Sequence, residues 1–82
     1  MTAKELLRRY EARELLFKNV HLRASDLSYQ NLRRICLYGA DLTDAKLVGT
    51  NLADADLHYA NLTGSNRQGW STKEANLWST FP

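Results

Sequence analysis

Apolar residues recur at every fifth position along most of this chain, a spacing that fits neither a regular helix nor a straight strand. On an α-helix a step of five residues turns the side chain by about 140° net, which would spread these residues around the circumference. On a strand an odd step alternates between opposite faces. Only a chain that turns a corner once per repeat returns each apolar residue to one interior. The unbroken run is Phe17, Leu22, Leu27, Leu32, Leu37, Leu42, Leu47, Leu52, Leu57 and Leu62, and the phase returns at Leu77.

The positions around each of these central residues follow a second pattern. Two residues earlier the side chain is usually small or aliphatic, and Gln30 is a departure from that rule. The residue just before the central one is often Asp or Asn, and Gly39, Gly49 and Gly64 follow central residues by two. Asp, Asn and Gly are typical of tight turns. The pattern therefore predicts a coil with corners, filled by a stack of leucines.

Several blocks of the chain resemble the pentapeptide-repeat family, whose motif is A(D/N)LXX. They include Gly39-Ala40-Asp41-Leu42-Thr43 and Asp54-Ala55-Asp56-Leu57-His58, and the match covers about residues 15–64 with a return at 75–79. The resemblance implies an all-β solenoid, a right-handed quadrilateral β-helix of about three coils with four repeats per coil. The segment 3–10 also resembles the helical cap of small cyanobacterial members.

Four repeats per coil would stack residues that lie twenty positions apart. Phe17, Leu37, Leu57 and Leu77 would then form one column, and Leu22, Leu42 and Leu62 a second. A buried leucine contributes about 1.5–3 kcal/mol. This regular core explains how a chain of only 82 residues, which buries a modest share of its surface, can hold together.

We expect a single domain over 1–82, with an N-terminal helical cap at 2–14, regular coils at 15–64 and an irregular C-terminal coil or cap at 65–82. Thr2 and Glu5 fit a capping box that begins a short amphipathic helix over residues 3–13. Binding of this basic helix to an anionic membrane is the alternative, but its acidic residues nearly balance its basic ones.

The repeat pattern breaks near the C-terminus, where Arg67 and Thr72 occupy central positions. Burying an unpaired arginine is costly, so the pattern predicts that residues 64–73 loop out or distort. Two interpretations of the following residues remain. Either the coil resumes at 75–77, which we favour slightly, or Ser71 and Glu74 form a second capping box that begins a short helix.

The C-terminal segment is also rich in large apolar side chains. Together they could close the core or dock on another molecule, including a second copy of the chain. The candidate end-docking residues are Trp70 and Phe81, beside Leu77 and Trp78.

Composition narrows the function classes. The chain is 44% hydrophobic and 24% charged, with a net charge of +2, which is ordinary for a folded protein and too weak to indicate nucleic-acid binding by itself. The charge is mildly polarised, since residues 1–34 carry most of the basic side chains. No signal peptide or long apolar run is visible, and with a single cysteine we expect a cytoplasmic protein.

The residue pattern does not point to catalysis, a cofactor or a metal. His21 and His58 are far apart in coil register, and Asp54 and Asp56 follow the repeat rather than forming an acid pair. Cys36 precedes a central residue, which places its thiol on the outside; a disulfide across a dimer is the less favoured alternative. We therefore predict no catalytic, cofactor-binding or metal-binding residues and no enzyme activity.

One outward column differs from the others. The residues directly after one column of central positions are Lys18, Tyr38, His58 and Trp78, and Tyr59 flanks them. Exposed aromatic residues are typical of interaction surfaces. The equally weighted alternative is that they pack across neighbouring coils and stiffen that side.

Our main hypothesis is a non-enzymatic scaffold or adaptor that binds an unidentified protein partner, with a homodimer through the C-terminal end as one form. The resemblance also implies an alternative, a DNA-mimic modulator of a nucleic-acid enzyme such as DNA gyrase. The relatives with that activity are longer, dimeric and acidic, whereas the first half of this chain is basic. A peripheral subunit of a membrane-associated complex is a third hypothesis. We expect neither direct nucleic-acid binding nor membrane insertion.

Overall fold

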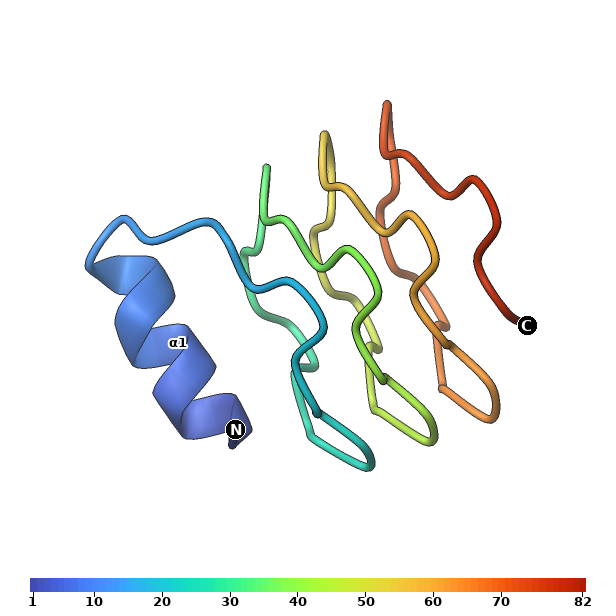
Figure 1. Ribbon diagram of the computed structural model, residues 1–82, viewed down its shortest axis with the longest axis horizontal. Helices are drawn as coiled ribbons and strands as arrows, with labels where there is room; N and C mark the ends of the chain where they lie inside the picture. Colours follow the sequence, from blue (N-terminus) through green and yellow to red (C-terminus); the bar gives the residue numbers. More distant parts are fainter.

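The computed structural model describes all residues 1–82 and shows a chain that winds as a coil away from one helix, α1 (Ala3–Glu11) (Figure 1). Parallel bridges join residues twenty positions apart, from Leu16–Cys36 at the first coil to Asn61–Phe81 at the last. This offset equals four five-residue repeats, so the predicted stacking register is confirmed. Each bridge is isolated, however, and no side of the coil forms a longer strand.

A tight turn follows every central residue and forms the corner of the coil. In each turn the second residue after the central one has a positive φ, between 57° and 72° for residues 19–79. The next N–H then donates to the central carbonyl, as from Ala40 to Leu37 at 3.0 Å. A positive φ at the third position is the signature of a type II turn. The corners therefore need residues that tolerate left-handed backbone.

The Asp and Asn residues of the repeat brace these corners. Their side-chain oxygen accepts a hydrogen bond from the N–H two residues later, as between Asp56 and His58 or Asn76 and Trp78, both at 3.0 Å. Short polar side chains are suited to such local bonds. The recurring Asp and Asn before each central residue thus have a structural reason in the turn itself.

The interior contains the predicted leucine stack. All ten central residues from Phe17 to Leu62 are buried, and Leu77 at the end of the stack is 36% exposed. The small residues two positions earlier fill the rest of the interior. Among them Thr50 is buried, and its hydroxyl donates to the carbonyl of Leu27 at 2.8 Å.

Helix α1 lies against the first coil, at the opposite end from the C-terminus (Figure 1). Thr2 Oγ1 accepts from the N–H of Glu5 at 3.1 Å and so begins the helix as predicted. Leu6 is buried within the same core as the leucine stack. The Tyr10 hydroxyl donates to the carbonyl of Arg33 at 2.8 Å, which ties the helix to the coil. The helix ends at Glu11, two residues before the predicted end at 13.

The predicted irregularity at 65–82 does not occur, and the coil is present at 75–77, as the favoured interpretation expects. The bridges continue in register through Asn66, Ser71, Asn76 and Phe81, and no second helix forms. The last coil has a neighbouring coil on one side only, so its central side chains are not enclosed. The side chain of Arg67 is exposed, with its Cζ 5.6 Å from the centre of the Trp70 ring. An arginine can therefore hold a central position without burying its charge.

Candidate functional site

The predicted outward column is a continuous cluster in the structure. Because residues twenty apart are stacked, Tyr38, His58 and Trp78 follow one another along a single side of the coil. The ring centres of Tyr38 and His58 are 5.4 Å apart, and those of His58 and Trp78 are 4.9 Å apart. The Nζ atom of Lys18 lies 5.6 Å from the centre of the Tyr38 ring, within the range of a cation–π interaction.

Tyr59 belongs to the same cluster although it occupies the turn position. Its ring stacks on His58 with centres 4.2 Å apart and an angle of 20° between the planes. It also meets the Tyr38 ring edge-on at 5.4 Å. We call these five residues, Lys18, Tyr38, His58, Tyr59 and Trp78, the aromatic cluster.

The aromatic cluster is only partly covered. Tyr38 and His58 are half-buried, and the Nε2 atom of His58 is buried without a hydrogen-bond partner. Tyr59 is 44% exposed and Trp78 is 69% exposed. The rings therefore pack across neighbouring coils, as the second interpretation expects, and still present apolar surface to solvent. Their use as an interaction surface stays a prediction.

The C-terminal end of the coil forms a second apolar area. Trp70 is half-buried and packs against the core, while Phe81 is exposed beside the open last coil. The structure therefore separates the two predicted end-docking residues, because Trp70 covers the leucine stack and only Phe81 faces outward.

Cys36 directly precedes the central residue Leu37 and is a half-buried free cysteine. Its backbone bridges to Leu16 in the coil before and Asp56 in the coil after. The expected outward position is confirmed, and the disulfide across a dimer stays a prediction.

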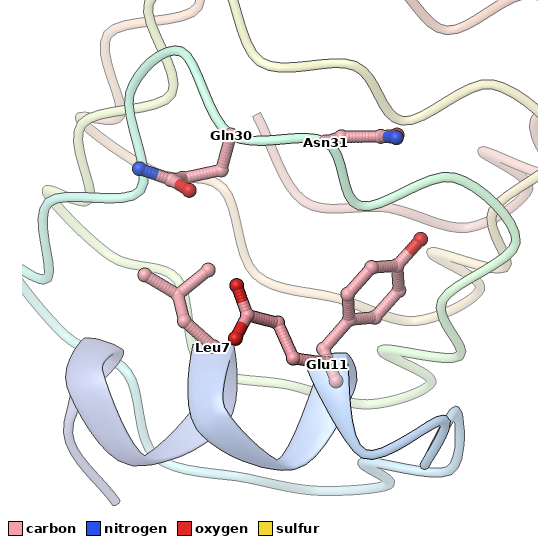
Figure 2. Close-up of a pocket in the computed structure, with 5 residues that line it drawn as sticks. Leu7, Glu11, Gln30 and Asn31 are labelled. Atoms are coloured by element: carbon pink, nitrogen blue, oxygen red, sulfur yellow. The ribbon is translucent and has the colours of Figure 1, made fainter.

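A hollow between α1 and the first coil was not predicted from the sequence. It has a volume of about 250 Å³ and is lined by Leu7, Tyr10, Glu11, Gln30 and Asn31 (Figure 2). The only sequence signal for it is Gln30, the departure from small residues at the inner position. The hollow also depends on where α1 docks, which the repeat pattern does not specify.

Two ion pairs join charged side chains of neighbouring coils. Arg23 pairs with Asp41 at 3.3 Å and Arg33 with Asp54 at 3.2 Å. A hydrogen bond from the Thr43 hydroxyl lowers the pKa of Asp41 below its ordinary value, and the Thr43 N–H adds to the effect. These pairs lie on the outside of the coil and leave its surface mixed in charge.

The repeating unit itself identifies the chain. Residues 35–66 match the family model for pentapeptide repeats, with eight copies. The chain is a pentapeptide-repeat protein. Pentapeptide repeats imply a right-handed quadrilateral β-helix, and the twenty-residue bridge offset found here is the four-sided coil of that fold.

Among solved structures, the chain is similar to HetL, a pentapeptide-repeat protein involved in heterocyst differentiation regulation from the cyanobacterium Nostoc sp. strain PCC 7120. The two are 31% identical, the TM-score is 0.37, and the match covers 80% of this chain and 38% of HetL. The chain thus spans well under half of the length of HetL. No curated protein matches this sequence.

Two further observations bear on the chemistry of this pentapeptide-repeat protein. No group of three or more His, Cys, Asp or Glu side chains lies close enough together to hold a metal ion. None of its helical structure combines the length and apolar character needed to cross a membrane.

Proposed function

We propose that this pentapeptide-repeat protein is a non-enzymatic scaffold that binds a protein partner through the aromatic cluster. The observation that carries the proposal is the exposure of Tyr59 and Trp78 on one side of a hydrogen-bonded coil. Aromatic residues with exposed faces are enriched at protein interfaces and often supply most of the binding energy.

The backbone beneath the aromatic cluster is fixed by bonds between coils. The Gly39 N–H donates to the carbonyl of His58 at 2.9 Å, and the Tyr59 N–H to the carbonyl of Trp78 at 3.3 Å. The contacts between the rings also limit their rotamers. A partner would therefore meet a surface that loses little conformational entropy on binding.

The charge distribution does not support DNA mimicry. A DNA mimic needs a continuous acidic surface, whereas Arg23 and Arg33 lie among the acids of the coil and pair with them. Direct binding of α1 to anionic lipid is also less favoured, because Arg8 and Arg9 pair with Glu5 and Glu14. Protein binding is the function class that the geometry supports best.

The experiment is affinity capture from the native cell with three forms of the chain. We expect Tyr59→Ala/Trp78→Ala to lose the proteins that the unmodified chain retains. Tyr29→Ala is the matched control, since Tyr29 is 77% exposed but does not contact the aromatic cluster. Equal retention by all three forms would contradict this surface, and inhibition of DNA supercoiling by the unmodified chain would favour the gyrase alternative.

The homodimer through the C-terminal end stays a prediction. If Phe81 and the open last coil pair with a second copy, light scattering will give twice the monomer mass. Phe81→Ser should then restore the monomer without changing the fold, because Phe81 lies outside the core. Dimers that survive this substitution would place the contact elsewhere.

A further inference from the structure

The hollow between α1 and the first coil combines one carboxylate, one unbonded amide, an aromatic ring and an aliphatic side chain. They come from Glu11, Gln30, Tyr10 and Leu7 respectively. We propose that this hollow binds a guanidinium group, either on a small molecule or on an arginine side chain of a partner. The inference is independent of the aromatic cluster, which lies on the coil and shares no residue with the hollow.

Two features of Glu11, which is exposed on α1, would favour a bound cation in the hollow. Glu5 and Glu14 are paired with arginines of the helix segment, but no cation of the chain lies within ion-pair distance of Glu11. Glu11 is also the last residue of α1, where the helix dipole places partial negative charge. A carboxylate at a helix C-terminus is disfavoured by that dipole, and a bound cation would relieve both charges at once.

Gln30 supplies the opposite wall of the hollow. It stands at an inner position of the repeat, where most other coils place a small side chain. Its side-chain amide is half-buried and forms no hydrogen bond in the structure. Figure 2 shows the Gln30 amide and the Glu11 carboxylate extending into the space between helix and coil. A donor group placed there would bond to both.

The remaining walls favour a planar cation. Leu7 gives an aliphatic surface, and the Tyr10 ring is held in place by its hydroxyl bond to the Arg33 carbonyl at 2.8 Å. A guanidinium stacks on such a ring while its N–H groups bond in their plane to a carboxylate. Asn31 contributes only to the rim, since its Oδ1 already accepts from the Arg33 N–H at 3.3 Å.

No cationic side chain of this protein pairs with Glu11 in the hollow. Arg33 pairs with Asp54 of the next coil. It is the arginine nearest in the sequence to Gln30 and Asn31, which line the hollow from the coil. Arg8 on the helix lies 4.0 Å from Glu5. A volume of about 250 Å³ accommodates a guanidinium with a short alkyl stem.

The test is an NMR titration of the full chain with methylguanidinium at constant ionic strength, with tetramethylammonium as the comparison cation. We expect saturable shifts of the Gln30 side-chain amide and the Tyr10 ring. Glu11→Gln should weaken binding at least about tenfold, because it removes a charged hydrogen-bond acceptor. Glu74→Gln, which removes an exposed acid far along the coil, is the matched control and should leave the affinity unchanged.

Gln30→Ala gives a second variant that the fold tolerates, since alanine is common at this position of the repeat. It should weaken methylguanidinium binding while the spectrum remains that of a folded coil. An affinity unaltered by Glu11→Gln and Gln30→Ala, shifts equal to those with tetramethylammonium, or no shift in the hollow would each overturn the proposal.

A blocked Gly-Arg-Gly peptide separates the two sources of the guanidinium. Binding at least as tight as that of methylguanidinium would assign the hollow to an arginine side chain of a protein partner. Binding of methylguanidinium without the peptide would assign it to a small molecule. Either result supports guanidinium recognition.

Discussion

At the residue scale, the turns of the coil restrict which residues the sequence can place there. The backbone is left-handed at the second residue after each central position, yet most of these residues are not glycine, as at Ala24, Tyr29 and Asp54. A side chain costs about 1–2 kcal/mol in this conformation. The coil therefore contains a repeated small strain that the interior and the bonds between coils must offset.

Ala24→Gly should stabilise the protein by about 0.5–1 kcal/mol, since the gain at φ 60° exceeds the added flexibility of the unfolded chain. Gly49→Ala should act oppositely and cost more than about 1 kcal/mol. Its φ is 65°, and a Cβ there would lie 2.7 Å from the ring of Tyr29. Urea unfolding followed by circular dichroism measures both, and a loss of stability in Ala24→Gly would argue against strain at the turns.

The Asp41 carboxylate gives a second prediction at this scale. The Thr43 hydroxyl, 2.6 Å from Oδ1, lowers the pKa of Asp41. Because the folded pKa is depressed, the associated stability is present above the ordinary Asp pKa and is lost as the pH falls through the folded value. Thr43→Val should raise the pKa of Asp41 toward its ordinary value, as followed by carboxyl NMR.

Thr63→Val is the matched control for Thr43→Val. Thr63 makes the same 2.6 Å bond one coil later, but to the neutral amide of Asn61. Thr63→Val should lose this hydrogen bond without altering how the free energy of unfolding changes as the pH falls. If both variants change the acid response equally, the hydrogen bond to Asp41 is not its cause.

At the element scale α1 and the first coil depend on each other. Leu6 places its side chain in the same core as Phe17 and Leu22, so the helix encloses the start of the leucine stack. A nine-residue helix is too short to be stable alone in water, so α1 depends on its packing against the coil for stability.

Leu6→Ala should lower the free energy of unfolding by about 2–5 kcal/mol, because it leaves a cavity where helix and coil meet. Leu16→Ala is the matched control. Leu16 is 68% exposed, so its truncation should change stability by no more than about 0.5 kcal/mol. Chemical unfolding of the two variants compares them directly, and equal effects would mean that α1 is not coupled to the coil.

At the scale of the whole molecule each coil contacts only its neighbours, as in other solenoids. The middle coil has a neighbour on both sides, whereas the last coil has one. The Leu42 N–H donates to the carbonyl of Asn61 at 2.8 Å, and the Phe81 N–H donates to the carbonyl of Ala60 at 2.9 Å. The two bonds are similar in length but lie in different coils, one in the middle and one at the end.

Hydrogen exchange should therefore be slower for the Leu42 amide than for the Phe81 amide by at least about tenfold, since local opening begins where fewer neighbours must be lost. Exchange measured by NMR on the unmodified chain provides the test. Equal protection at the two amides would show that the coil opens as one unit.

The five-residue period was sufficient to predict the interior, because only a coil returns every leucine to one side. The repeat pattern does not predict that Arg67 fits into the coil, because a central position is enclosed only where a coil has a neighbour on each side, and Arg67 is exposed. The aromatic cluster followed from the register alone. The hollow at Gln30 did not, since it depends on the docking of α1 against the coil.

The twenty-residue register has a genetic consequence. A tandem duplication of the codons for a single repeat between His58 and Trp78 would keep the leucine stack filled, yet it would rotate every later residue by one side of the coil. Trp78 would then leave the side that holds Tyr38 and His58. Duplication of a whole coil would lengthen the protein and return Trp78 to that side, one coil further from Tyr38. Length in such a protein can therefore change freely in whole coils, while any surface made of several coils resists smaller insertions.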